Sequence, residues 1–236
     1  MDPHNLSAIG SPSRAGLPPG QRRRRDFPRF GVPFLSPPPA PDVPGLAVTG
    51  AVEHDLRLPL AELHSILPRV EQVADFHCVA TWSATGLHWS GVSFRQFWEQ
   101  VVVPRCKPAD ATVGIIAHGA DGVTAVIDLR DAMADNVMLA DRLDGQPLDD
   151  RHGAPLRLVS PSQYGYKNIK HLIRLEATRT FPKPGLILGE HPRARVAFEE
   201  RDPYLNARLY RLIGRALTRP IAWLNRRAPT RSSTNR

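Results

Sequence analysis

The fold of this chain is decided by the stretch Asp75-Phe76-His77-Cys78-Val79-Ala80-Thr81-Trp82-Ser83. The apolar run from Phe76 to Ala80 carries a cysteine at its centre, which predicts the end of a buried strand followed by a loop. At such a strand end, Cys78 could act as a thiolate ligand or a nucleophile. A single cysteine in an apolar run is more often a small core residue. This stretch alone therefore leaves both interpretations open.

The chain has 236 residues, of which 42% are hydrophobic, so it can bury one core with appendages. Its two cysteines, Cys78 and Cys106, do not make a disulfide framework and fit a reducing compartment. No apolar stretch approaches the roughly 20 residues of a membrane span. Arg24-Arg25-Asp26-Phe27 resembles a twin-arginine export motif, but prolines interrupt the sequence that follows. We therefore predict a cytoplasmic protein.

The net charge of +8 is spread unevenly along the chain. Residues 1–30 contain six Arg and two Asp, and residues 191–236 contain eleven Arg and three acidic residues. The middle of the chain, residues 31–190, is therefore net acidic. This distribution indicates an electrostatic role for the two ends, with an acidic partner or surface, or a role in solubility.

We predict three regions. Residues 1–26 form a disordered basic segment, because they are rich in Pro, Ser, Gly and Arg and have few large apolar side chains. Residues 27–190 form the folded domain, which begins with a proline-rich arm. Residues 191–236 form a basic, partly helical tail, whose helix should start at Asp202-Pro203 and break at Pro220. The apolar stripe of that helix could pack on the domain, dock on a partner or lie on an acidic membrane face.

The pattern of short strands and few short helices predicts an α+β fold dominated by sheets. Ser93 and Gln96 form a capping box, and the aromatic face of the helix that follows should pack in the core. Asp144-Gly145 predicts a hairpin turn. Further helices are expected at 59–67 and 128–134. Strands are expected at 46–52, 113–117, 123–127, 137–143, 156–159 and 172–177.

Basic residues gather in two later stretches, His152 to Arg157 and Tyr164 to Lys170. Both lie near a glycine and a strand end, where cationic side chains and free backbone N–H groups suit a phosphate. Taken singly, Arg157 could be a solvated edge residue, and so could Lys167 or Lys170.

Taken in order with the Cys78 stretch, these pieces resemble the molybdopterin domain of the sulfite oxidase family. The resemblance covers about residues 27–180. It also includes Asp26 to Gly31, Trp89 to Val92 and Asp144 to Leu148. The loop after Cys78 is similar to that of the bacterial branch that contains the protein-methionine-sulfoxide reductase catalytic subunit. The resemblance implies a sheet-rich sulfite-oxidase-type domain with few short helices and a helical C-terminal tail.

The resemblance also implies a cofactor, molybdenum-molybdopterin, and roles for individual residues. Cys78 would be the catalytic residue and the thiolate ligand of molybdenum, a soft donor suited to that metal. The pterin and its phosphate would be held by His152, Arg157, Asn168, Ile169 and Lys170. Phe27, Arg29 and Phe30 would cover the cofactor from the arm, and His118 lies where the family often contacts it.

The implied reaction is two-electron oxygen-atom transfer on a small S- or N-oxide or an oxidisable sulfur compound. Electrons would be exchanged with a separate carrier protein, free or membrane-associated, which could dock on the basic tail. Val79 to Ser83 carry no cation, which argues against a plain sulfite oxidase, since a buried anion needs a paired charge. Arg193 or Arg195 could supply that cation from the tail. Tyr204 could take the position of an active-site tyrosine.

Two other functions remain as alternatives. A non-catalytic molybdopterin-binding or cofactor-handling protein would hold the pterin without redox turnover. A nucleic-acid- or anion-binding module would work through its basic ends. The acidic middle and the absence of alternating basic and aromatic residues count against nucleic acid as a partner.

Overall fold

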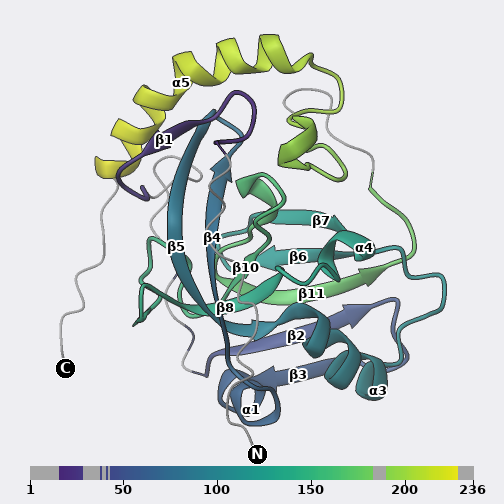
Figure 1. Ribbon diagram of the computed structural model, residues 1–236. Helices are drawn as coiled ribbons and strands as arrows, with labels where there is room; N and C mark the ends of the chain where they lie inside the picture. The colour runs from purple at the N-terminus through teal and green to yellow at the C-terminus, as the bar shows by residue number, and fades with distance from the viewer. Residues whose placement is uncertain (1–15, 29–37, 39–40, 42, 183–189, 228–236) are drawn as a thin grey trace, which may run out of the picture.

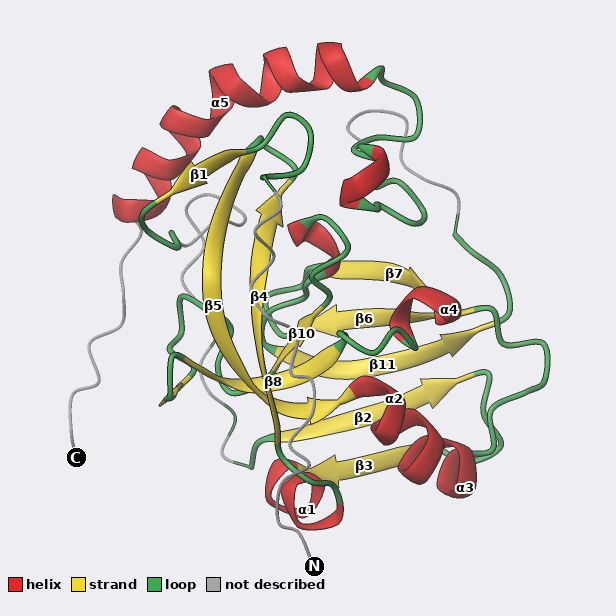
Figure 2. Ribbon diagram, viewed as in Figure 1, coloured by secondary structure: helices red, strands yellow, loops and turns green. Residues whose placement is uncertain are grey.

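The computed structural model describes residues 16–28, 38, 41, 43–182 and 190–227 (Figure 1). Two β-sheets dominate, with short helices beside them and one long helix at the C-terminal end (Figure 2). The predicted α+β, sheet-rich fold is therefore confirmed. Among the described residues, no helix is both long enough and apolar enough to cross a membrane.

Sheet A carries the Cys78 stretch and has six strands. Its longest members form a β4–β5 hairpin, in which Cys78 pairs with Trp82. Asp144 and Gly145 connect β8 to β9 with φ angles of 50° and 76°, the left-handed pair expected of the predicted hairpin turn. The strands are β1 (Arg22–Arg24), β4 (Val70–Cys78), β5 (Trp82–Ser93), β8 (Met138–Leu143), β9 (Gln146–Pro147) and β10 (Arg157–Val159).

Sheet B has five strands in the order β3-β2-β11-β6-β7. The pair β11–β2 is parallel, and the other neighbours are antiparallel. Alternate residues of these strands point into the main core, where Leu46, Ile115 and Ile127 are fully buried. The strands are β2 (Gly45–Gly50), β3 (Leu56–Pro59), β6 (Gly114–Gly119), β7 (Thr124–Asp128) and β11 (Leu172–Thr178).

The helix that follows β5 packs against this core. Ser93 Oγ accepts the Gln96 backbone N–H at 3.4 Å, which confirms the predicted N-cap. Phe94, Phe97 and Val101 are completely buried, so the predicted core packing of the aromatic face is also confirmed. The short helical segments are α1 (Leu60–Ile66), α2 (Phe94–Phe97), η1 (Trp98–Val102), α3 (Val103–Cys106), α4 (Leu129–Ala132), η2 (Gly165–Lys167) and η3 (Val196–Phe198).

The long C-terminal helix, α5, differs from the prediction at both ends. It spans Ala207–Arg227, because Asp202 caps the preceding turn by accepting the N–H groups of Tyr204 and Leu205. It also continues through Pro220. The predicted apolar stripe does not pack fully on the domain, since Leu209 and Leu212 are 48% and 68% exposed.

The N-terminal segment also needs a correction. Residues 1–15 lie outside the described residues, but Arg22–Arg24 form β1, which pairs in parallel with Trp82 to Ala84 of β5. The prediction of disorder is therefore wrong for this part of the segment. Backbone pairing with a sheet edge explains the order without any need for large apolar side chains. In Figure 1, β1 and α5 lie together beside the end of β5 that follows Cys78.

Candidate functional site

Cys78 is the last residue of β4, as the sequence predicted. A tight turn of three residues, Val79 to Thr81, leads directly into β5. The Thr81 N–H donates to the Cys78 carbonyl at 3.1 Å, and Thr81 has a left-handed φ of 76°. The loop that we expected after Cys78 is thus a turn, and it holds the thiol at a fixed strand end.

The Cys78 thiol is 6% exposed, and burial raises its pKa to about 12. The positive charge of Arg201 acts in the opposite direction and favours the thiolate. Arg201 is itself buried, donates to the Val79 carbonyl at 2.7 Å and lies over the Tyr164 ring at 4.8 Å. On the α5 side, Tyr210 is near enough for the Cys78 charge to contribute to its raised pKa. The thiol therefore lies in an apolar setting with one buried guanidinium beside it.

Arg201 is a residue that the sequence analysis missed. The cations we had suggested are engaged elsewhere: Arg193 Nε donates to Asp131 at 2.8 Å, and Arg195 Nε donates to Glu200 at 3.0 Å. Both suggestions are therefore wrong. Tyr204 is 61% exposed, and this exposure does not suit a residue of a buried active site.

Arg157 forms the second part of the site. Its side chain is 2% exposed and donates to two backbone carbonyls, those of His152 at 2.8 Å and Asn168 at 3.3 Å. The guanidinium also lies over the ring of Trp89, 4.9 Å from its centroid. Burial lowers its pKa to about 9, because no nearby carboxylate compensates for the lost hydration. Burying an unpaired cation is costly, so this arrangement is suited to an anion that none of the described residues supplies.

The structure gathers five of the predicted cofactor-binding residues around one small pocket. They come from the arm, from β10 and the segment before it, and from the loop before β11: Phe27, His152, Arg157, Asn168 and Lys170.

The contacts within this pocket hold its walls in place. His152 bonds to Asp149 at 2.7 Å through Nδ1 and to the Phe27 carbonyl at 3.0 Å through Nε2. Asn168 Oδ1 accepts the Ser160 N–H at 2.7 Å. The pocket therefore combines the buried Arg157 guanidinium with polar side chains that hydrogen bonds hold in place.

Two other predicted residues, His118 and Ile169, do not line this pocket. His118 lies on sheet B, where its Nε2 bonds to Glu176 at 2.9 Å, and it lines a different groove. Ile169 is a buried core residue whose carbonyl accepts the Leu158 N–H at 2.9 Å. Arg29 and Phe30 lie outside the described residues. The expected contact of His118 with the cofactor is therefore not supported.

An aromatic cluster connects the Cys78 turn to the Arg157 pocket. The Phe76 ring lies 5.0 Å from Phe27 and 5.7 Å from Trp82, the pairing partner of Cys78. The Phe27 ring also stacks on His152, with centroids 4.8 Å apart. The two parts of the site thus share one hydrophobic wall.

The residues fit molybdopterin chemically. Arg157 is a buried cation without a carboxylate partner among the described residues, which suits a phosphate, and Cys78 is a soft donor for a metal. The space is smaller than the group requires. The pocket has a volume of about 40 Å³, whereas pockets for drug-sized ligands measure roughly 300–1,000 Å³. Phe27 is one of the side chains that line the pocket, and its ring lies against Phe76 and His152.

Comparisons with known proteins agree with this chemistry. Residues 36–185 match the family described as the oxidoreductase molybdopterin binding domain. The chain is 37% identical over 138 residues to the putative protein-methionine-sulfoxide reductase subunit YedZ1 of Azospira oryzae, a match that covers 58% of this chain and 50% of that protein. It is 33% identical to the uncharacterized oxidoreductase YuiH of Bacillus subtilis, and that match covers 57% of this chain and 65% of that protein.

Two further matches are more distant. The protein-methionine-sulfoxide reductase catalytic subunit MsrP of Campylobacter jejuni is 28% identical, with 58% of this chain and 49% of that protein covered. The crystal structure of the sulfane dehydrogenase SoxCD from Paracoccus pantotrophus shares the fold, with a TM-score of 0.50 at 23% identity, covering 58% of this chain and 38% of that one. The matched region thus spans between half and two thirds of the curated relatives.

Proposed function

We propose, since the chain belongs to the oxidoreductase molybdopterin binding domain family, that its molybdenum-molybdopterin cofactor is held between Cys78 and Arg157 and catalyses oxygen-atom transfer on a small S-oxide. The observation that carries this proposal is the buried Arg157 guanidinium, which has no carboxylate partner among the described residues. A phosphate would supply the missing negative charge.

Each residue of the pocket has a defined task in this proposal. Arg157 donates a planar pair of N–H groups to the phosphate, and Lys170 adds a second cation. His152 and Asn168 present polar groups that are already oriented by Asp149 and Ser160. When bound, the cofactor supplies the two-electron redox chemistry.

Cys78 acts as the metal ligand. Its thiol is protonated in the apolar surroundings described above, and a metal ion favours the thiolate outright. The positive charge of Arg201 also favours the thiolate form of Cys78. The tight turn fixes the sulfur at the end of β4, so ligation costs little conformational entropy.

The substrate side of the site favours a neutral oxide. Residues 79–83 carry no charge, and the one cation that acts on Cys78, Arg201, is already bonded to the carbonyls of Val79 and Pro19. Two relatives are named as methionine-sulfoxide reductase subunits, which supports reduction of an S-oxide as the direction of transfer.

An external electron carrier is the proposed protein partner, and α5 is its proposed docking element. Arg208 and Arg215 are exposed on this helix, together with Leu209 and Leu212, so its outer face is both basic and apolar. Arg211 is instead bonded to Glu199 at 2.7 Å. This surface is suited to an acidic partner with an apolar patch, free or membrane-associated.

The test is purification from a host that makes the cofactor, followed by metal and pterin analysis and turnover with methionine sulfoxide, trimethylamine N-oxide and sulfite. We expect molybdenum and pterin in the wild type, with turnover of the sulfoxide. Cys78→Ser should lose turnover while keeping pterin, and Cys106→Ser should keep both. Pterin without turnover of any compound would favour a cofactor-handling protein. The absence of both molybdenum and pterin would exclude the proposal.

A further inference from the structure

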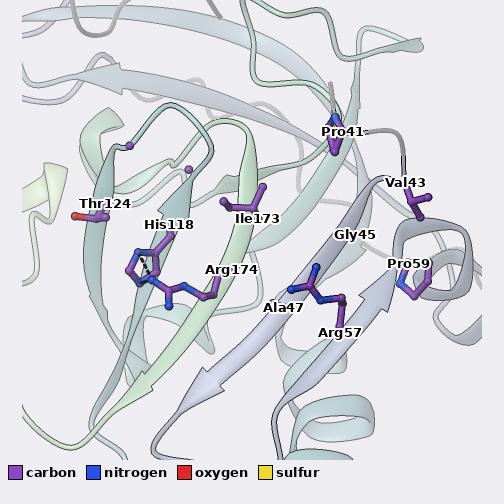
Figure 3. A pocket seen from close by; sticks show the side chains of 12 residues that line it. Pro41, Val43, Gly45, Ala47, Arg57, Pro59, His118, Thr124, Ile173 and Arg174 are labelled. Carbon is purple, nitrogen blue, oxygen red and sulfur yellow. Dashed lines mark hydrogen bonds between the residues drawn. The ribbon is translucent and has the colours of Figure 1, made fainter. Parts of the chain in front are cut away.

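A groove with a volume of about 700 Å³ lies on the outer face of sheet B (Figure 3). Its volume is within the range of small-molecule sites. None of the described residues that line it also lines the pocket around Arg157. It is therefore a second candidate site, separate from the cofactor pocket.

The strand register builds a polar row across the floor of this groove. Arg57 pairs with Ala47, Ala47 with Arg174, Arg174 with His118, and His118 with Thr124, each on the next strand. Paired residues point to the same face of a sheet. This face is opposite the one on which Leu46 and Leu175 are buried in the core. All five side chains consequently line one groove, as Figure 3 shows.

The two arginines stand on either side of a small residue. Neighbouring strands are about 4.8 Å apart, so the Cα atoms of Arg57 and Arg174 are separated by about 10 Å, with Ala47 between them. A methyl group leaves the space above it open. An acidic group above Ala47 would therefore lie between the two arginines, with Arg57 on one side and Arg174, whose guanidinium is directed toward His118, on the other (Figure 3).

Arg174 is held in position by its neighbours. Its Nη2 lies against the His118 ring, 3.0 Å from Nδ1 and 3.3 Å from Nε2, and His118 Nε2 is 2.9 Å from Glu176. Arg174 thus uses one N–H group on His118 and keeps its others for a ligand.

Arg57 contributes a second positive charge. No ion pair or hydrogen bond of its side chain is found among the described residues, and it is exposed at the groove. Glu176 is the acidic member of this cluster, 3.8 Å from Arg174. Two guanidinium groups against one carboxylate leave the floor of the groove net positive.

The rest of the lining is small or apolar. Gly45 and Gly119 keep the floor flat, and Pro59 and Ile173 present apolar surface beside the arginines. Such a lining fits a flat apolar body, while the cations fit an acidic group attached to it.

We propose that this groove binds a small organic anion, with a carboxylate or phosphate between Arg57 and Arg174 and a ring or other apolar body on the glycine floor. The proposal is independent of the redox function, because the two sites share no lining residue among those described.

The test uses 1-naphthyl phosphate as the probe. Inorganic phosphate and 1-naphthol are the comparison ligands, because they carry its acidic group and its apolar ring separately. We expect saturable binding of 1-naphthyl phosphate by calorimetry, weaker binding of phosphate, and none of 1-naphthol. Arg57→Gln and Arg174→Gln should each weaken binding about tenfold, as expected for loss of a charge-assisted contact, and the double variant should abolish it. Arg179→Gln, which removes an exposed arginine just after β11, is the matched control and should bind as the wild type does.

Amide chemical shifts locate the probe. Binding should perturb the backbone amides of Gly45 and Gly119. Perturbation confined to His152 and Asn168 would show that the probe has entered the cofactor pocket instead, and the proposal would fail. Equal affinity in the wild type and the double variant, or 1-naphthol binding as tightly as its phosphate, would also overturn it.

Discussion

The Arg157 guanidinium lies over the Trp89 ring, 4.9 Å from its centroid, and donates only to backbone carbonyls. A cation in this position is solvated by π-electrons and carbonyl dipoles, neither of which cancels its charge. The phosphate of the cofactor therefore has a preformed partner, and the strength of that pairing can be measured by substitution.

We expect Arg157→Met to lower the pterin content of the purified protein at least tenfold. Hydrogen bonds to charged groups contribute about 1.5–3 kcal/mol each, and the variant loses all of those from the guanidinium. Arg157→Lys should retain an intermediate amount, because an ammonium keeps the charge without the planar fork. Pterin fluorescence after release from the protein measures the content. Arg142→Met on neighbouring β8 is the control, and a pterin content equal to that of this control would contradict the role of Arg157.

The raised pKa of Cys78 predicts slow alkylation of the metal-free protein. At pH 8 a thiol with a pKa of about 12 has roughly a thousandfold less thiolate than one with the ordinary value of 9.0. In a Cys106→Ser background, iodoacetamide should therefore modify Cys78 about a thousandfold more slowly in the folded than in the unfolded protein. Mass spectrometry follows the reaction. Equal rates would show that the thiol is not desolvated.

The same thiol predicts a pH dependence of stability. Because its folded-state pKa is raised, the unfolded state binds fewer protons above pH 9, and the free energy of unfolding falls as the pH rises from about 9 to about 12. In Cys78→Ser, the part of this fall in the free energy of unfolding that comes from the thiol should be absent. Urea unfolding of the metal-free protein and the variant at several pH values in this window measures it, and parallel curves would rule the effect out.

We expect Phe27→Ala to have opposite effects on stability and on cofactor insertion. The ring contacts Phe76 and His152 and is half-buried, so its loss should reduce the free energy of unfolding by about 1–3 kcal/mol. The ring also lines the pocket, so its removal should enlarge the pocket and speed insertion of the pterin. Urea unfolding and the time course of cofactor loading measure the two effects. Phe181→Ala, at a ring that is 39% exposed, is the control. Insertion no faster than in the wild type would show that Phe27 does not obstruct the pocket.

Charge reversal on α5 should slow reduction by the protein electron donor. We expect Arg208→Glu combined with Arg215→Glu to lower that rate at least tenfold at low ionic strength. The difference should shrink as salt rises, because the Debye length falls from about 30 Å at 0.01 M to about 3 Å at 1 M. Reduction by a small dye should be unchanged, and Arg179→Glu, which reverses one exposed charge outside α5, is the control. A rate that is the same in all variants would remove α5 as the docking element.

Local signals in the sequence predicted several elements correctly. The hairpin at Asp144-Gly145 and the helix start at Ser93 depend on neighbouring residues, and both have the expected conformation. Strand β5 was missed, although it is the longest strand. Its small residues are weak strand formers, so the local sequence does not indicate a strand. Packing against β8 explains why one of them is a glycine, since a Cβ at Gly91 would clash with the Leu139 carbonyl oxygen.

The candidate site was predictable to a similar extent. Cys78, His152 and Arg157 are found where the ordered motifs implied, at the end of β4 and in and just before β10. Arg201 was not predictable, because it lies in the charged run Glu199 to Asp202, which is typical of a solvated surface. Its bond to the Val79 carbonyl joins positions 122 residues apart. No local pattern encodes such a contact.

The bond from Arg201 to the Pro19 carbonyl, 3.1 Å long, spans 182 residues of the chain. The side of the Cys78 turn that Arg201 contacts is therefore completed only after residue 201 has been synthesised. A nascent chain that ends before Arg201 lacks this guanidinium and α5 as well, so the strand end that carries Cys78 is then more open than in the finished protein. The order of synthesis thus provides an interval, before release from the ribosome, in which the turn is accessible from that side.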